Sequence, residues 1–128
     1  MRLEHVAIWT HDLERLRAFY ERHFGARVGA RYESATRAGF MSYFLEFPDG
    51  GARLELMRVP TLSDAAPAPA AGYAHLALSL GSERAVDALT ARLRDAGVPV
   101  VSAPRRTGDG YYESVVADPD GNLVELTA

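Results

Sequence analysis

The sequence lacks cysteine, a large net charge and long apolar runs, and each absence removes a class of function. Without cysteine the chain has neither disulfide bonds nor a thiol nucleophile, and this composition suits a reducing compartment. The net charge is −3 with acidic and basic residues interspersed, so neither a nucleic-acid surface nor a basic membrane-binding face is expected. No apolar run approaches a membrane span, and no signal segment precedes the first predicted strand. We therefore expect a soluble cytoplasmic protein.

What the chain does contain is an internal repeat. His5 in LEHVAIW and His75 in YAHLALSL lie 70 positions apart (75 − 5), and Glu55 and Glu125 keep the same spacing (125 − 55). Each glutamate follows a turn and lies between aliphatic residues of a β-prone run. At 128 residues the chain is long enough for one domain with a buried core. We therefore predict a single domain, residues 1–128, built from two matching modules.

Both halves have the element order strand, helix and then three strands. The first helix begins after Asp12, which can cap it, and ends at Gly25. The second helix begins after Ser82 and stops at Gly97. The remaining β-prone runs predict strands at residues 3–9, 26–34, 40–47, 52–57, 73–80, 98–102, 111–117 and 122–127. The buried stripe of the second helix is expected to consist of Val86, Leu89 and Leu93.

A linker is predicted between the two halves. Residues 60–72, PTLSDAAPAPAAG, are rich in proline and alanine and have no usable periodicity. Module one is therefore expected at residues 1–59 and module two at residues 73–128.

Alternation along the strands predicts that both histidines and both glutamates lie on the sheet face opposite the helix. Their aliphatic neighbours would pack under the helix, so the polar side chains point the other way. Imidazole and carboxylate together suit zinc, iron, nickel, cobalt or manganese, with room for one or two waters. We therefore predict that a divalent metal ion is bound by His5, Glu55, His75 and Glu125.

A single histidine or glutamate in a strand is more often a structural or solvent-facing residue. The matched set of four favours metal binding because each member occupies the same position in its own repeat. His11, before the first helix, and His23, in its last turn, do not belong to this set and are expected at the surface.

These segments resemble the vicinal-oxygen-chelate superfamily, which includes glyoxalase I, bleomycin resistance proteins and extradiol dioxygenases. The resemblance covers nearly the whole chain and is carried by LEHVAIWTHDLERLRAFYERHFGA, RLELM, YAHLALSL and DPDGNLVEL. It implies an α+β fold in which two tandem βαβββ modules form a curved, cup-shaped mixed sheet with the helices on the outer face. It also implies that His5, Glu55, His75 and Glu125 occupy the four metal-ligand positions of the family.

Within the superfamily, the complete ligand set is most similar to that of glyoxalase I. Bleomycin-binding relatives lack the metal ligands, extradiol dioxygenases lack a carboxylate at the position of Glu55, and methylmalonyl-CoA epimerase usually has glutamine there. The resemblance implies a lyase or isomerase that transfers a proton on a chelated small oxygenated substrate or thiol adduct, through a metal-stabilised enediolate. The catalytic carboxylates would be Glu125, as the base, and Glu55.

Two alternatives remain open on the same fold: a metal- or small-molecule-binding protein of the resistance type without turnover, and an Fe(II) dioxygenase. Neither the substrate nor the identity of the metal follows from the sequence.

Two positions depart from the glyoxalases that use glutathione. Those enzymes hold the tripeptide with an arginine near the end of the first strand and an asparagine just past the second ligand, where this chain has Trp9 and Val59. Glutathione is therefore not the expected thiol. The residues expected to line the substrate site are Trp9, Arg58, Arg106 and Tyr111, and Arg105 could add positive charge. Residues 107–112, with two glycines and two tyrosines, could form a lid or a plain hairpin loop.

The resemblance also implies a homodimer. In relatives the cup often forms between modules of two chains, so we expect His5 and Glu55 of one chain to meet His75 and Glu125 of the other. The predicted linker is long enough for this pairing or for pairing within one chain.

Overall fold

The structure is a computed structural model, and it describes residues 1–64 and 71–128. The chain divides into two compact units. We call Met1–Ala66 the first unit and Pro67–Ala128 the second unit. The linker predicted for residues 60–72 lies partly outside the described residues. The single-domain organisation and the module boundaries stay predictions.

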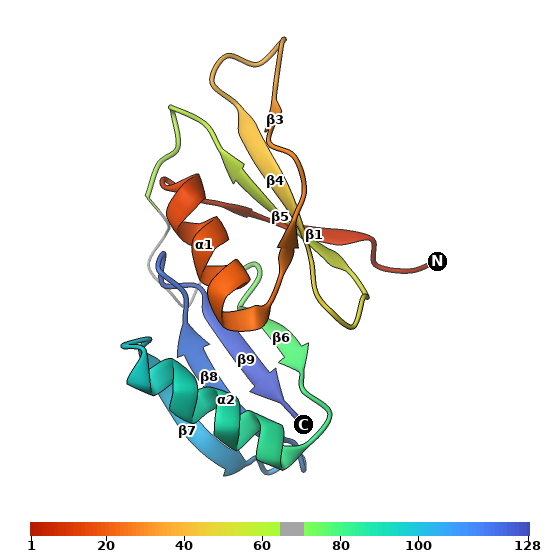
Figure 1. The fold of residues 1–128 in the computed structure, drawn as a ribbon, viewed down its shortest axis with the longest axis vertical. Helices are drawn as coiled ribbons and strands as arrows, with labels where there is room; N and C mark the ends of the chain where they lie inside the picture. The colour runs from red at the N-terminus through yellow and green to blue at the C-terminus, as the bar shows by residue number, and fades with distance from the viewer. Residues whose placement is uncertain (65–70) are drawn as a thin grey trace. The chain divides into compact units, whose positions relative to one another are not determined.

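The first unit pairs one helix with a mixed sheet (Figure 1). In chain order it contains β1 (His5–Trp9), α1 (Leu13–Phe24), β2 (Arg27–Val28), β3 (Tyr32–Glu33), β4 (Met41–Glu46) and β5 (Arg53–Arg58). The sheet order is β1-β5-β4-β2, and β3 also pairs with β4. Strand β1 runs parallel to β5, whereas β2, β3 and β5 run antiparallel to β4.

Helix α1 packs on this sheet through a single apolar stripe. Asp12 caps it by accepting a hydrogen bond from the N–H of Arg15 at 3.0 Å. Gly25 ends it in the left-handed conformation, with φ 66°. The side chains buried in this unit include Leu13, Leu16, Phe19 and Tyr20 on α1 and Leu45, Leu54 and Leu56 on the sheet. Each such burial contributes roughly 1.5–3 kcal/mol, so the aliphatic face of the sheet is fixed toward α1.

The second unit repeats this arrangement. It contains β6 (His75–Ser79), α2 (Glu83–Asp95), β7 (Val100–Arg106), β8 (Tyr112–Ala117) and β9 (Leu123–Thr127), with the sheet order β6-β9-β8-β7. Strand β6 runs parallel to β9, as β1 does to β5. Ser82 caps α2 by accepting from the N–H of Ala85 at 3.3 Å.

The buried side of α2 differs from the prediction in one residue. Val86 and Leu93 are fully buried as expected, but Thr90 is buried as well, at 1% exposure, whereas Leu89 is half-buried. The Thr90 hydroxyl donates to the carbonyl of Val86 at 2.7 Å and contacts the Ser114 hydroxyl of β8 at 2.6 Å. These hydrogen bonds satisfy both buried hydroxyls, which hydrophobic periodicity alone does not reveal.

The DPDGN motif before β9 has a structural role. Asp118 is buried, and its carboxylate accepts hydrogen bonds at 2.9 Å from the backbone of Asp120 and from the backbone and side chain of Asn122. Gly121 takes φ 83°, which residues other than glycine rarely adopt. The motif therefore sets the turn that delivers β9, and with it Glu125, to the sheet.

The predicted α+β fold with two tandem βαβββ modules is confirmed, with two differences in detail. The strand predicted at residues 26–34 is split into β2 and β3, and Gly29 and Ala30 lie between them. The strand predicted at residues 98–102 extends to Arg106 as β7, across two register shifts against β8. Arg105 and Arg106 therefore lie in a strand and not in a loop. None of the described helices has the length and apolar character needed to cross a membrane.

Candidate metal centre

The first candidate pair is His5 on β1 and Glu55 on β5. The parallel register places Ala7 directly opposite Glu55 and His5 opposite Arg53, so His5 and Glu55 are diagonal neighbours on one sheet face. The His5 Nε2 lies 3.8 Å from the Glu55 Oε2. The glutamate side chain is 15% exposed and the imidazole 39%, so a sheltered carboxylate stands beside an accessible nitrogen.

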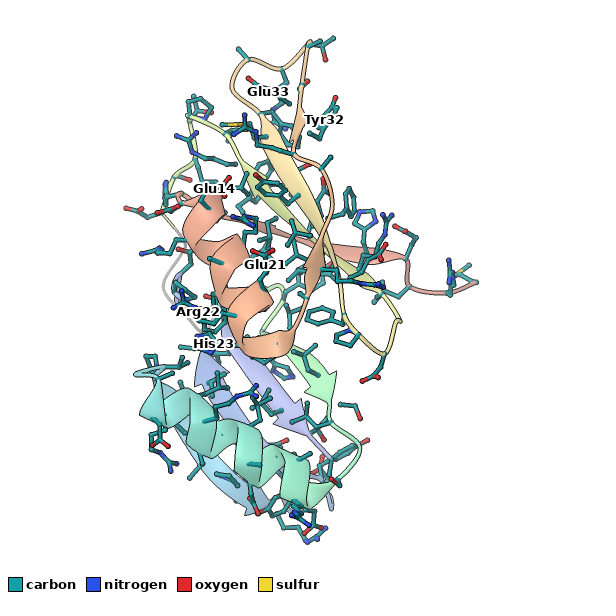
Figure 2. The ribbon with its side chains drawn as sticks, in the orientation of Figure 1. Glu14, Glu21, Arg22, His23, Tyr32 and Glu33 are labelled. Atoms are coloured by element: carbon teal, nitrogen blue, oxygen red, sulfur yellow. The ribbon has the colours of Figure 1, made fainter. Side chains whose placement is uncertain are left out.

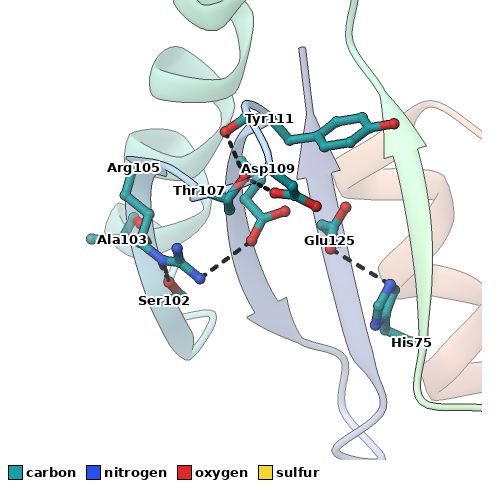
Figure 3. A network of polar contacts seen from close by, with 9 residues as sticks. His75, Ser102, Ala103, Arg105, Thr107, Asp109, Tyr111 and Glu125 are labelled. Carbon is teal, nitrogen blue, oxygen red and sulfur yellow. Dashed lines mark hydrogen bonds and ion pairs between the residues drawn. The ribbon is translucent and has the colours of Figure 1, made fainter.

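The second candidate pair, His75 and Glu125, has the same geometry. Ala77 is opposite Glu125 and His75 opposite Leu123, which is the register of the first pair displaced by 70 positions. The His75 Nε2 lies 3.5 Å from the Glu125 Oε2 (Figure 3). The sequence repeat is thus a repeat of side-chain geometry.

Each unit by itself brings together one histidine and one glutamate, two side-chain types that can bind a metal. Ligand atoms that lie side by side on one divalent ion, each at 2.0–2.2 Å, are roughly 3 Å apart. The observed separations of 3.8 and 3.5 Å are close to this spacing, and imidazole with carboxylate is a donor set that such ions accept. Across residues 1–64 and 71–128, no group of three or more potential ligands is clustered. The four-residue ligand set therefore stays a prediction.

His5 is held by neighbours that the sequence analysis missed. The Glu4 carboxylate contacts its Nδ1, and Glu4 in turn accepts a hydrogen bond from the Arg53 Nε at 2.9 Å. These hydrogen bonds, from His5 first and Arg53 second, hold the pKa of Glu4 below its usual range. The ring of Phe44 meets the imidazole edge-on, with 5.3 Å between centroids. A carboxylate on Nδ1 favours the tautomer whose free lone pair is on Nε2, the atom that faces Glu55.

Glu125 has a different environment, which also includes a residue that the sequence analysis missed. Burial, and then the negative charge of Glu113, raise the pKa of Glu125, while His75 acts in the opposite direction. Glu113 is opposite Thr127 in the β8–β9 register, and therefore lies on the same sheet face as Glu125. Its Oε1 is 3.4 Å from the Arg105 Nη2. Arg105, predicted as a source of positive charge, thus compensates the negative charge of Glu113.

Trp9 and Arg58, two of the predicted substrate residues, lie at the far ends of β1 and β5. Trp9 is 40% exposed and has the burial pattern of His5, on the same side of β1. Arg58 donates through its Nε to the carbonyl of His11 at 3.3 Å. Trp9 is therefore accessible on the face of the His5–Glu55 pair, whereas Arg58 supports the loop before α1.

Arg106 and Tyr111, the other two predicted substrate residues, belong to the β7–β8 hairpin. Arg106 pairs with Glu83 at the start of α2 and donates to the carbonyl of Gly110 at 3.2 Å. The Tyr111 carbonyl accepts from the N–H of Thr107 at 2.8 Å and closes the turn, while the Tyr111 side chain is 59% exposed. These contacts describe an ordered hairpin, and the lid role of residues 107–112 stays a prediction.

The remaining histidines, His11 and His23, both belong to the first unit. His11 is exposed, as predicted, with its Nε2 3.3 Å from Asp64 Oδ1. His23 lies at the end of α1 (Figure 2) and is half-buried against Phe19, with ring centroids 5.1 Å apart.

The comparisons with known proteins agree with this fold. Residues 2–126 match the Glyoxalase/Bleomycin resistance protein/Dioxygenase superfamily. Among solved structures, the trypanothione-dependent glyoxalase I of Leishmania major is 25% identical with a TM-score of 0.77, over 99% of this chain and 86% of that one. A glyoxylase/bleomycin resistance protein/dioxygenase domain from Frankia sp. EAN1pec is 19% identical with a TM-score of 0.84, over 99% and 96%.

A glyoxalase I of Zea mays is 21% identical with a TM-score of 0.78 over 98% of this chain. The match covers only 44% of the maize chain, so this protein spans less than half of that relative's length. None of the curated proteins matches the sequence significantly.

Proposed function

Because the chain belongs to the glyoxalase/bleomycin resistance protein/dioxygenase superfamily, we propose that it is a metal-dependent lyase or isomerase of the glyoxalase I type. The observation that carries this proposal is the pair of matched His–Glu contacts, His5 with Glu55 and His75 with Glu125. Relatives without metal chemistry have no need for a histidine and a glutamate at the same register position in both modules.

The proposed ligands of the divalent metal ion are His5, Glu55, His75 and Glu125. When bound, the ion would polarise vicinal oxygens of the substrate as a Lewis acid. The Glu4 carboxylate keeps the His5 Nε2 available as a ligand by occupying Nδ1. Nickel, zinc, cobalt, manganese and iron all suit this donor set.

Glu125 is the proposed base. Burial and the nearby Glu113 raise its pKa, which makes its carboxylate a better proton acceptor than an ordinary exposed glutamate. In the first unit the position equivalent to Glu113 is Ser42, which is opposite Met57 in the β4–β5 register, so a hydroxyl stands there and not a carboxylate. Glu125 would therefore take the proton from the substrate carbon and return it to the adjacent one, with Glu55 as the second catalytic carboxylate.

The thiol of the substrate adduct is proposed to be something other than glutathione. Trp9 presents an indole where the glutathione-using enzymes have an arginine, and Val59 is 9% exposed. A charged tripeptide placed against these side chains would lose hydrogen bonds with water, at roughly 1–3 kcal/mol per unsatisfied group. Turnover of the methylglyoxal–glutathione adduct is therefore expected to be poor.

Metal analysis tests the proposal most directly. Protein loaded with nickel, zinc, cobalt or manganese and then dialysed is expected to retain one ion per predicted four-residue site. His5→Ala and His75→Ala should each lose it, whereas His11→Ala, which removes an exposed histidine from the same unit as His5, should not. Loaded protein is then assayed with methylglyoxal and phenylglyoxal adducts of several thiols. Protein that retains no metal after dialysis would favour the non-catalytic binding role. Oxygen-sensitive bound iron would favour a dioxygenase.

A further inference from the structure

The first sheet carries a row of four side chains on the face of the His5–Glu55 pair, of which Trp9 and Tyr32 at the two ends are exposed, while Met57 is half-buried and Ser42 is buried. In the register, Trp9 of β1 is opposite Met57 of β5, Met57 is opposite Ser42 of β4, and Ser42 is opposite Tyr32 of β3. Side chains directly opposite one another share a face. These four residues therefore form one line across the face that carries Glu55, two positions along β5 from Glu55 itself.

Three aromatic rings gather on this line. Phe40, just before β4, meets Trp9 edge-on with centroids 6.2 Å apart and meets Tyr32 at the same distance. Trp9 is 40% exposed and Tyr32 56%; Tyr32 projects from β3 in Figure 2. Trp9, Tyr32 and Phe40 form what we call the aromatic surface. A contiguous exposed apolar group of this kind is typical of a binding site, whereas single exposed rings are not.

A guanidinium lies over the aromatic surface. The Arg37 Cζ is 5.4 Å from the ring centroid of Trp9 and 5.3 Å from that of Phe40. Within residues 1–64, no carboxylate forms an ion pair with Arg37. Four other arginines of the first unit do have carboxylate partners: Arg17, Arg27, Arg31 and Arg53. Arg37 therefore offers its hydrogen-bond donors to a ligand.

The loop that carries Arg37 is fixed by hydrogen bonds. The Ser34 hydroxyl accepts from the N–H of Arg37 at 3.0 Å, and the Ser34 N–H donates to the Phe40 carbonyl at 3.0 Å. The Phe40 N–H donates to the Arg37 carbonyl at 3.1 Å. Gly39 takes φ 70° against the ring of Pro60, where a Cβ would clash at 2.5 Å. The backbone that carries the guanidinium and the Phe40 ring is thus fixed before any ligand arrives, which lowers the entropy cost of binding.

The spacing between this surface and the candidate metal ligands suits a small substrate. Two residues along a strand span about 6.6–6.8 Å, so the Trp9–Met57 row lies that far from the row of Glu55. One planar ring with a short substituent covers this distance.

We propose that the aromatic surface and Arg37 bind planar aromatic compounds that carry a carboxylate, and that they select substrates of this class for the neighbouring His5–Glu55 pair. The link to turnover rests on the proposed function, but binding itself does not. Rings of the ligand stack against or meet Trp9 and Phe40 edge-on, while the guanidinium pairs with the carboxylate through charge-assisted hydrogen bonds. Trp9 stands where glutathione-using enzymes have an arginine. Arg37 would supply a positive charge on this face for a substrate carboxylate.

The test uses Trp9 as its own reporter, because it is the only tryptophan of the chain and gives a single indole N–H resonance. Metal-free protein is titrated with benzoate, with benzyl alcohol as the neutral analogue and with butyrate as the non-aromatic anion. Benzoate is expected to shift the resonance saturably, with an affinity about tenfold above either analogue, since it alone engages both the rings and the cation. Arg37→Gln should lower the benzoate affinity to that of benzyl alcohol. The matched control is Arg31→Gln, an exposed arginine paired with Glu33 at 3.8 Å, and it should change nothing.

Three outcomes would overturn the inference. Benzoate could leave the indole resonance unmoved, or Arg37→Gln could bind it as tightly as the unmodified protein. The resonance could also depend on protein concentration and not on ligand, which would mean that a second copy covers the aromatic surface. Metal binding is measured on a separate portion of the same preparation, after loading with metal and dialysis. Protein that binds benzoate but no metal refutes only the proposed function, and protein that binds metal but no benzoate refutes only this inference.

Discussion

Replacing Glu4 by alanine tests how the first candidate pair is held. The carboxylate contacts the Nδ1 of His5 and is itself positioned by two hydrogen bonds from Arg53. In Glu4→Ala, the imidazole loses the partner that keeps its lone pair on Nε2. Removal of a group that orients a ligating histidine typically weakens metal affinity by about 10–100-fold. The Glu4 side chain is 49% exposed, and because water can replace part of its contact, we expect metal affinity to fall by about tenfold, at the low end of this range.

Isothermal titration of metal-free protein with zinc or nickel measures this change, and the second unit provides a comparison. Ala74 precedes His75 where Glu4 precedes His5, so the carboxylate that contacts His5 is replaced by a methyl group in the second unit. The matched control is Glu46→Ala, which removes an exposed carboxylate 3.8 Å from Arg27 in the same unit. An equal loss of metal affinity in Glu4→Ala and Glu46→Ala would show that the effect comes only from the change in net charge. Unchanged affinity in Glu4→Ala would show that the contact with Nδ1 does not prepare His5 for the metal.

Three further outcomes are expected. If the predicted homodimer shares its sites between chains, mixing and refolding His5→Ala with His75→Ala should restore one metal site per heterodimer. Pairing of the modules within one chain would restore none. The metal content after mixing distinguishes the two arrangements. Glu125→Gln should lower turnover about 10²–10⁴-fold while metal is retained. Near-normal single-turnover rates would show that a group other than Glu125 acts as the base. The Tyr43 hydroxyl donates to Glu14 at 2.8 Å and holds the pKa of that carboxyl below its usual range. The resulting stability is present above the unfolded pKa and is lost as pH falls through the folded one. Tyr43→Phe should therefore destabilise by up to about 1 kcal/mol near neutral pH, because both partners are partly exposed, and by progressively less in acid; thermal melts from pH 7 to pH 3 check this.

Local sequence rules were sufficient for most of the fold. Asp12 and Ser82 cap their helices as predicted, and Gly25 ends the first. The second helix ends at Asp95 with Ala96 as its C-cap, directly before the predicted stop at Gly97. Caps and left-handed glycines depend on neighbouring backbone, so a short window of sequence contains the information. The repeat spacing of 70 positions also predicted the structure correctly, because each histidine is 50 positions before its glutamate (55 − 5 and 125 − 75) and the two pairs occupy equivalent registers.

Contacts between distant segments needed the tertiary structure. Glu4 is visible beside His5 in the sequence, but its bond to Arg53, 49 positions away, follows only from the β1–β5 pairing. Glu113 reaches the face of Glu125 through the β8–β9 register. Its contact with Arg105 depends on the β7–β8 register, whose two shifts are hard to foresee from the sequence. Arg37 is part of an irregular loop whose direction is set by Ser34 and Gly39. The sequence by itself determined the elements, their order and which four residues repeat. Only the tertiary structure decided which charged and aromatic side chains surround them, because strand register and loop conformation depend on partners far away in the chain.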